Sequence, residues 1–409
     1  MSELDRLIEE LCPDGVEYKE LWKVTTWDKN FNRVANYKQE RTIKYYHKTA
    51  IELKRLRVDD GNVKILFTGS TDSGFTTEKL ADKIISKGEI VAIPWGGTPW
   101  VQYYKGRFIT GDNRIATSSN LKILNNKYLY YVLKNNIKTI GSFYRGSGIK
   151  HPDMVKVLDY QIPLPPLPVQ EEIVRILDNF TELTAELTAE LTAELTARRK
   201  QYEYYRDELL TFGDEVEWKA LEEIGKISMC RRIFKNETAT DGDIPFFKIG
   251  TFGQEPDAFI TRELFEEYKE KYSYPKKGDI LISASGTIGR RIIFNGEPSY
   301  FQDSNIVWVD NDESKVLNKF LYYYYTVIKW NVSTGGTIKR LYNKNIEKTQ
   351  IPILPLSEQE RIVSILDKFD ALTNDIAIGL PAEIEARQKQ YEYYREKLLT
   401  FKELETKEA

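Results

Sequence analysis

Basic residues beside glycine-rich turns are the side chains of this chain whose types and spacing suit a specific chemistry. They are Arg290 and Arg291 after the Gly-Thr-Ile-Gly turn at 286–289, and Lys339 and Arg340 after the Gly-Gly-Thr turn at 335–337. Glycine lets a backbone approach a phosphate closely, and Arg and Lys bind phosphates and can read guanine in a major groove. These residues are therefore candidates for contact with nucleic acid, although the same turns would serve equally well to build a domain.

The first half of the chain offers counterparts of this set. Residues 146–150 repeat the Gly, Ile and Lys of residues 335–339 at the same spacing, and Gly96 corresponds to Gly286. The candidate contact residues near these positions are Trp95, Trp100, Arg114, Arg145 and Lys150.

The sequence lacks the residue patterns of common catalytic and cofactor sites. Its two histidines, His47 and His151, are too few and too scattered for a metal site or a catalytic triad. It has no Walker A sequence, no Gly-rich cofactor loop after a strand, no Asn-Pro-Pro-Tyr type motif for a flipped adenine and no nuclease-like cluster of carboxylates with Lys. We therefore expect no catalytic residue, no metal and no cofactor in this chain.

Cysteine usage and hydropathy indicate the cytoplasm. Cys12 and Cys230 are the only cysteines, which is too few for a disulfide or zinc framework. The sequence has no signal peptide and no apolar run of membrane-spanning length, so we expect a protein with no membrane association.

The elements that must position the candidate residues come from a duplication. Residues 162–212 recur at residues 351–401, and the matched pairs, from Ile162 and Ile351 to Tyr205 and Tyr394, are 189 residues apart. No residue has been gained or lost within the repeat, so its length is held fixed.

Apolar residues in the first copy recur in steps of three and four, the spacing of one face of an α-helix. The pattern predicts a helix from about Val169 to Thr211, a rod of roughly 65 Å. We expect the second copy to form a similar rod, kinked or broken near Gly379 and Pro381, and the two rods to pack antiparallel. The leucines assigned to the packing stripe are Leu183, Leu187, Leu191 and Leu195.

Three tandem Thr-Ala-Glu-Leu units fill residues 184–195 of the first helix. Ala, Glu and Leu favour helix, so the units could be simple helical filler. A four-residue repeat drifts about 40° per unit on a helix of 3.6 residues per turn, which makes it a poor packing solution over long stretches. We therefore interpret the repeat as an adjustable spacer.

Both helices end in Lys-Gln-Tyr-Glu-Tyr-Tyr, and the tyrosines lie on acidic helices. This context favours a helix–helix or partner surface over a base-stacking platform. The residues assigned to it are Tyr202, Tyr204, Tyr205, Tyr391, Tyr393 and Tyr394.

A segment of about 150 residues precedes each helix. The two segments share an opening and several internal positions, but the residues between these shared positions differ almost completely. Runs at 280–283, 291–294 and 306–309 read as strands, and 128–134 and 317–329 read as helices. We expect an α+β fold: two related globular domains separated by two long antiparallel helices, with pseudo-twofold duplication. The expected divisions are an N-terminal segment at 1–15, domain 1 at 16–165, a central helix at 166–212, domain 2 at 213–354, a distal helix at 355–402 and a polar tail at 403–409.

Positive charge is concentrated in domain 1. Residues 16–160 hold 25 Lys and Arg against 14 Asp and Glu, residues 216–350 hold 20 against 19, and the rest of the chain holds 14 against 29. This division is expected if domain 1 meets a polyanion and the helices do not, although a charged run is more often only a solvated face.

Taken together, these features resemble the specificity subunit of type I restriction-modification enzymes, the IC subclass in particular. The resemblance rests on the Ile-Pro-x-x-Pro-Leu opening, the Gly-Asp-Ile-Leu-Ile-Ser run at 278–283, the Thr-Ala-Glu-Leu repeats and the ending at 379–395. Domain 1 departs from it at 93–98, where Ile-Pro-Trp-Gly-Gly-Thr replaces the more typical Ser-Ala-Ser-Gly-Thr-Ile of domain 2.

The resemblance implies that each domain is a target recognition domain for one half of a bipartite, asymmetric site in double-stranded DNA. It implies that the helices set the spacing and dock two modification subunits, and that restriction subunits join the complex. S-adenosylmethionine, ATP and Mg would then belong to those partners. Two alternatives remain: a coiled-coil scaffold with non-specific DNA binding, and a fused methylase-nuclease.

Overall fold

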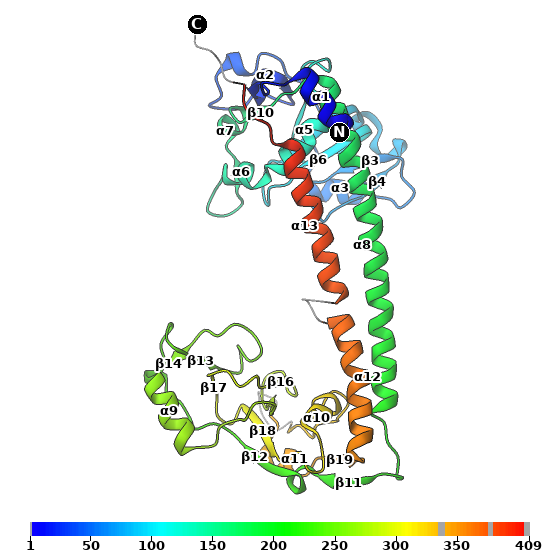
Figure 1. The fold of residues 1–409 in the computed structure, drawn as a ribbon. Helices are drawn as coiled ribbons and strands as arrows, with labels where there is room; N and C mark the ends of the chain where they lie inside the picture. The colour runs from blue at the N-terminus through cyan, green and yellow to red at the C-terminus, as the bar shows by residue number, and fades with distance from the viewer. Residues whose placement is uncertain (1, 334–339, 375–378, 405–409) are drawn as a thin grey trace. The chain divides into compact units, whose positions relative to one another are not determined.

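The computed structural model describes residues 2–333, 340–374 and 379–404. The chain forms two compact units, Met1–Ala189 with Glu385–Ala409, and Glu190–Ile384. We call them unit 1 and unit 2. Each unit holds one of the two α+β domains together with segments of both repeated helices, so the repeat in sequence is also a repeat in structure (Figure 1).

Unit 1 is built on a six-stranded sheet in the order β2-β7-β5-β6-β3-β4, in which only β3 and β6 are parallel. Its strands are β2 (Thr25–Trp27), β3 (Val63–Leu66), β4 (Phe75–Thr76), β5 (Ser86–Pro94), β6 (Gln102–Thr110) and β7 (Asn113–Ser118). Two short antiparallel pairs complete it: β1 (Tyr18–Glu20) with β10 (Gln161–Pro163), and β8 (Tyr144–Arg145) with β9 (His151–Pro152). The helices are α1 (Glu3–Leu11), α2 (Leu21–Val24), α3 (Ala50–Leu56), α4 (Glu78–Ala81), α5 (Asn126–Asn135), α6 (Ile137–Ser142), α7 (Met154–Leu158) and the 3₁₀ turns η1 (Asn36–Lys38) and η2 (Asp82–Ile84).

Unit 2 has a four-stranded sheet in the order β12-β18-β15-β16, a three-stranded sheet in the order β14-β13-β17, and the pair β11-β19. Its strands are β11 (Glu217–Ala220), β12 (Gly225–Ser228), β13 (Ile244–Phe247), β14 (Phe259–Ile260), β15 (Ile280–Ser283), β16 (Arg291–Ile293), β17 (Tyr300–Phe301), β18 (Ile306–Asn311) and β19 (Gln350–Ile353). The helices are α9 (Arg262–Lys271), α10 (Asn318–Tyr324), α11 (Asn343–Glu347) and the 3₁₀ turns η3 (Leu221–Glu223) and η4 (Lys235–Glu237).

The three predicted strands correspond to β15, β16 and β18, and the first predicted helix to α5. The helix predicted at 317–329 was too long, because α10 ends at Tyr324. The residues that follow include Thr326, Val327 and Ile328, whose β-branched side chains lose rotamer freedom in a helix.

The first repeated helix is uninterrupted. Figure 1 shows α8 as a single helix, Leu167–Leu209. The second copy forms α12 (Leu356–Asn374) and α13 (Leu380–Leu399), with the non-helical Gly379 between them, so the predicted break is confirmed. Pro381 takes the second position of α13, where a missing backbone N–H costs no helical hydrogen bond.

Each domain completes its hydrophobic core with two helix segments. Val169, Ile173 and Leu177 of α8 join Leu399 of α13 in the main core of unit 1. In unit 2 the equivalents of Ile173 and Leu177, Ile362 and Leu366 of α12, join Leu210, the residue that follows α8. The paired segments run antiparallel: in unit 1, Thr181 lies against Tyr391 and Phe180 against Tyr394.

The predicted leucine stripe is only partly buried. Leu191 is 8% exposed and Leu187 and Leu195 are half-buried, whereas Leu183 is 60% exposed and departs from the prediction. The physical reason is the repeat itself. Its period of four residues rotates successive leucines by about 40°, so all four cannot face one neighbour.

A buried glutamine anchors the start of each helix to its domain. The Gln170 amide donates to the carbonyls of Ile123 (2.7 Å) and Pro165 (2.8 Å), and its oxygen accepts from the Asn125 N–H (2.9 Å). The equivalent residue, Gln359, makes the same three bonds to Lys315, Leu354 and Leu317, each at 2.8 Å. Both glutamines are fully buried.

About two helical turns further on, an aspartate makes a second anchor. Asp178 accepts from Tyr131 Oη (2.6 Å) and Lys127 Nζ (2.7 Å), and Asp367 accepts from Tyr323 Oη (2.5 Å) and Lys319 Nζ (2.8 Å). Burial raises the pKa of both tyrosines, and the hydrogen bond to the carboxylate raises it further, so both phenols remain donors.

The two ends of the chain meet in unit 1. Val16 bonds to Lys402 and Leu404 through backbone hydrogen bonds of 2.9 Å, and Tyr18 Oη donates to the carbonyl of Phe401 (3.1 Å). Gly15 permits this approach: its φ is +117°, and a Cβ would stand 2.6 Å from the Lys402 carbonyl oxygen.

We predict that Gln170→Leu lowers the free energy of unfolding by about 2–4 kcal/mol, because it leaves two carbonyls and one N–H buried without partners. Gln359→Leu should do the same to unit 2. Urea unfolding measures the change, and Gln161→Leu, at an exposed glutamine of β10, is the matched control. Equal stability of Gln170→Leu and the control would show that the helix is held by apolar packing alone.

Candidate nucleic-acid interface

A pocket of about 630 Å³ opens in unit 1 where β2 and β5 end and β7 begins. It brings together three of the residues predicted from sequence, Trp95, Arg114 and Arg145, and adds basic residues that the sequence analysis did not select. The residues that matter for its chemistry are Lys29, Arg33, Trp95, Arg114, Arg145 and His151.

Arg114 lines the pocket but is almost fully buried. Its side chain is 3% exposed, its guanidinium lies 4.2 Å from the centre of the Trp95 ring, and it donates to Asp112 (2.7 Å) and to the Asn113 carbonyl (2.8 Å). It lies 3.7 Å from the fully buried carboxylate of Asp28. A guanidinium so committed holds Trp95 in place, and burial disfavours a direct contact of Arg114 with a ligand.

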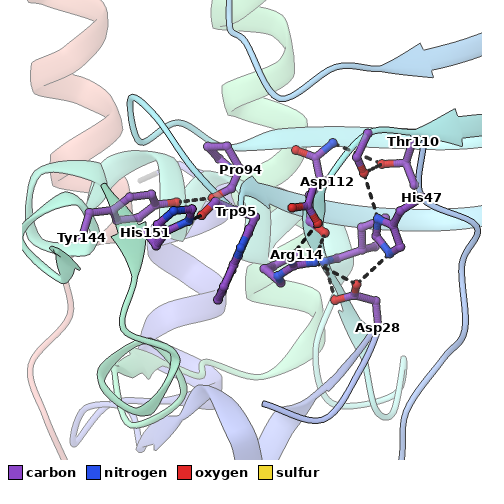
Figure 2. Close-up of polar contacts among 12 residues, drawn as sticks. Asp28, His47, Pro94, Trp95, Thr110, Asp112, Arg114, Tyr144 and His151 are labelled. Carbon is purple, nitrogen blue, oxygen red and sulfur yellow. Dashed lines mark hydrogen bonds and ion pairs between the residues drawn. The ribbon is translucent and has the colours of Figure 1, made fainter. Parts of the chain in front are cut away.

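Asp28 is held between three groups, as Figure 2 shows. One carboxylate oxygen accepts from the Ile115 N–H (3.0 Å), and the other lies 3.1 Å from Nε2 of His47 as well as near Arg114. Nδ1 of His47 lies 2.8 Å from the Gly111 carbonyl, which is an acceptor. This network fixes the strand ends beneath the pocket.

A hairpin presents the polar residues of the opposite wall. Arg145 and His151 are paired across β8 and β9, and both are exposed. The ring of His151 lies 5.3 Å from that of Trp95, and its Nδ1 lies 2.7 Å from the Trp95 carbonyl. A carbonyl only accepts hydrogen bonds, so Nδ1 of His151 carries the hydrogen of this contact. Nε2 of His151 takes no part in it (Figure 2). Arg145 pairs with Asp153 at 2.6 Å but remains 60% exposed.

The remaining candidates of domain 1 lie outside this pocket lining. Trp100 donates its indole N–H to the Thr68 carbonyl (2.7 Å) and is half-buried. Lys150 has an exposed side chain on the same hairpin, and its carbonyl accepts from the Gly97 N–H (3.0 Å).

In unit 2 the predicted arginines support the backbone. Arg290 donates to the Phe252 carbonyl (2.9 Å), Arg291 to that of Tyr322 (2.5 Å) and Arg340 to that of Ser304 (3.1 Å). Burial also lowers the pKa of Arg291. All three are half-buried, which is the arrangement expected if these turns build the domain. Lys339 lies outside the described residues.

A second pocket, of about 480 Å³, lies in unit 2 after β12, and its lining includes Arg231, Arg232 and Tyr272. The Arg231 guanidinium lies 5.3 Å from the Tyr272 ring, and Arg232 pairs with Asp303 at 3.0 Å. Both arginines are exposed. Exposed arginines on a loop, one of them over an aromatic ring, are suited to nucleic-acid contact.

The sequence contained a signal for the pocket residues that the sequence analysis did not select. The shared opening places Val16 200 residues before Val216, and carrying that offset forward aligns 29–33 with 229–233, the two loops that line the pockets. In the same way, the Ile-Lys pairs at 149–150 and 338–339 align His151 with Arg340.

The tyrosines that close the two repeats take equivalent places. Tyr202 and Tyr205 lie 6.4 and 5.7 Å from the ring of Phe369, and Tyr391 and Tyr394 contact Thr181 and Phe180. The middle tyrosine of each set is the most exposed: Tyr204 is 64% exposed and Tyr393 is 60% exposed.

Metal-binding and membrane-spanning features are missing from the described parts of the chain. Among those residues, no group of three or more His, Cys, Asp or Glu side chains could hold a metal ion. None of the helices in residues 2–333, 340–374 and 379–404 is long and apolar enough to cross a membrane.

Comparison with known proteins gives consistent matches along the chain. A type I restriction-modification specificity subunit from Escherichia coli, EcoR124I/EcoR124II, is 32% identical over 99% of both chains. A putative type I specificity subunit from Haemophilus influenzae, S.HindORF215P, is 55% identical over 77% of this chain and 83% of that protein. The crystal structure of an S subunit from M. genitalium shares the fold, with a TM-score of 0.50 and 18% identity over 94% of this chain and 96% of that one.

The family model for the type I restriction-modification DNA specificity domain matches twice, at residues 42–197 and 213–386. The chain therefore belongs to the family of type I restriction-modification specificity subunits.

Proposed function

We propose that this chain is the DNA-recognition subunit of a type I restriction-modification complex, of the IC subclass, acting in the cytoplasm. Each domain would read one half of a bipartite, asymmetric site in double-stranded DNA. The observation that carries the proposal is that two domains of one family each present a pocket with arginine and aromatic residues. A single-site DNA-binding protein would have no need of both.

The two recognition domains would be residues 16–165 and 213–354. The helix segments packed against each domain would support it. The chain itself would carry no catalytic residue and no cofactor. The modification subunits would bind S-adenosylmethionine and methylate, and the restriction subunits would use ATP and Mg. The family relationship and the missing catalytic motifs of the sequence support this division.

The proposal predicts that the chain, purified with its modification subunits, methylates DNA at a two-part site. Duplex binding should weaken steeply between 50 and 200 mM salt, because Lys and Arg displace counterions from phosphates. Sequencing of methylated adenines in the host measures the two-part site, and filter binding at the two salt concentrations measures the salt dependence. Methylation at a single undivided site, or by the chain alone, would contradict the proposal.

The central helix would set the distance between the two half-sites. Deleting Thr188–Leu191 removes one repeat unit, which shortens α8 by about 6 Å and rotates its ends by about 40°. B-DNA advances about 3.4 Å per base pair, so we predict an unread spacer shorter by about one base pair, up to about two on the rise alone, with both half-sites unchanged. The replacement of residues 188–191 by four alanines, which keeps the length, is the control. Methylation of the original site by the deletion variant would reduce the repeats to helical filler.

The exposed tyrosines Tyr204 and Tyr393 would each anchor one modification subunit. They have the same sequence context and nearly the same exposure, so they offer one surface twice. Exposed aromatic residues are frequent hot spots of binding. We predict that Tyr204→Ala or Tyr393→Ala weakens binding of one of the two modification subunits at least about tenfold, and that the double variant weakens both.

Native mass spectrometry of the mixed subunits measures the stoichiometry. Tyr46→Ala, at an equally exposed tyrosine of domain 1, is the control and should leave two modification subunits bound. If the double variant also binds two at wild-type affinity, the docking surface lies elsewhere.

A further inference from the structure

The loop that follows the first sheet strand occupies the same place in both domains. In unit 1, β2 pairs with β7 and continues into residues 28–34. In unit 2, β12 pairs with β18 and continues into residues 229–234. Each loop lines the pocket of its own unit. The two loops therefore occupy equivalent positions on the same strand framework, which we call the frame.

These loops differ in sequence, as do residues 22–28 and 222–228 before them, although the strands that carry the loops pair in the same way and the domain openings agree. Val16, Glu17, Lys19 and Leu21 are identical to the residues 200 positions later. Not one of the residues at 29–33, Lys-Asn-Phe-Asn-Arg, matches those at 229–233, Met-Cys-Arg-Arg-Ile. A shared frame with a divergent loop is the arrangement expected if the loop carries the property in which the domains differ.

The loop of domain 1 is held in a defined shape. Phe31 and Val34 are each 7% exposed, and the Phe31 ring lies edge-on to Trp27 at 6.0 Å. The Gln39 side chain accepts from the Phe31 N–H (2.7 Å) and donates to the carbonyls of Phe31 (3.1 Å) and Val34 (3.0 Å). Because these contacts order the loop before a ligand binds, less conformational entropy is lost on binding.

Three polar residues of this loop are exposed, one directly before Phe31 and two between Phe31 and Val34. Asn30, Asn32 and Arg33 are exposed and line the pocket. Arg33 has a φ of 70°, which only a fixed turn stabilises in a residue other than glycine. An asparagine amide can pair with the N6 and N7 edge of adenine, and a guanidinium with the O6 and N7 edge of guanine.

The loop of domain 2 offers different chemistry. Arg231 and Arg232 supply donors and no acceptors, whereas an amide supplies both. The Arg231–Tyr272 contact at 5.3 Å and the Arg232–Asp303 pair at 3.0 Å orient them. Domain 1 presents two amides beside Arg33, and domain 2 presents two arginines, so the two loops favour different base edges.

We propose that residues 29–33 and 229–233 are the specificity-determining loops of the two domains, and that their side chains read base edges in the major groove. The inference rests on the proposed function, and it assigns the reading to particular residues. Arg114, Arg290, Arg291 and Arg340 then build the frame, and Gln39 is a positioning residue that fixes the loop.

The test uses the full chain with its modification subunits, and maps methylated adenines in a host that lacks other methylation. Asn30→Ala with Asn32→Ala should relax one or two base positions of one half-site, with discrimination lowered on the order of tenfold to a hundredfold. Arg231→Ala should relax the other half-site only. Asn36→Ala, at an exposed asparagine next to the loop, is the matched control and should change neither.

A conservative variant covers the case in which the double variant fails to fold. Asn32→Asp keeps the size and the acceptor but loses the donor, so the preference at its position should shift from adenine toward cytosine, whose N4 amine donates. Uniformly slower methylation with both half-sites intact would mean that the loops touch phosphates only, and would overturn the inference. If the wild-type chain yields no bipartite site, the proposed function itself fails.

Discussion

The apolar faces of the repeated helices are the constraint on which the rest of this structure depends. Ile173 and Leu177, and their equivalents Ile362 and Leu366, are almost fully buried in the domain cores. Neither domain can be cut at its sequence boundary without exposing this surface, and each also draws one leucine from the other helix copy, Leu399 or Leu210. The helices are therefore parts of the domains as well as connections between them, and this explains why their length and residues repeat so closely. A shifted helix would lose both apolar packing and the glutamine hydrogen bonds together.

Polar anchoring makes that packing specific in register. Apolar side chains spaced three and four apart could slide by a turn at modest cost, but a buried glutamine with three backbone bonds has one satisfied position. The paired Tyr and Lys on each aspartate add a second fixed point. Since both copies retain both anchors, each recognition domain is held rigidly on its helix. A helix can act as a ruler between two sites only if its ends are fixed in this way.

Much of the architecture could be predicted from the sequence, because the signals were local or repeated. The continuous first helix, the break at Gly379, the strands at 280–283 and 306–309 and the antiparallel pairing all follow from periodicity and duplication. Residue 183 and the end of α10 were mispredicted, although the four-residue drift of the repeat and the β-branched residues after Tyr324 are both present in the sequence. The candidate site was harder still. Arg114 and Arg290 look like DNA contacts in sequence, but their guanidinium groups are spent on Asp112 and on the Phe252 carbonyl. A basic residue beside a glycine turn serves the fold or the ligand according to whether a carbonyl lies within reach, and only the tertiary structure decides that.

The division between frame and loop accounts for how one fold can carry two specificities. The buried charges of domain 1, Asp28 and Arg114, are costly to desolvate and are supported by fixed partners, so they cannot vary without loss of stability. Arg114 lines the pocket and Asp28 is buried beside it, where they hold Trp95, the end of β2 and the start of β7. The exposed residues between Phe31 and Val34 make no such contribution, because the loop is anchored by its two apolar side chains and by Gln39. Substitutions there cost little stability and change the hydrogen-bonding groups that face outward. A recognition surface built in this way can diverge while the helices, the glutamine and aspartate anchors and the cores stay the same.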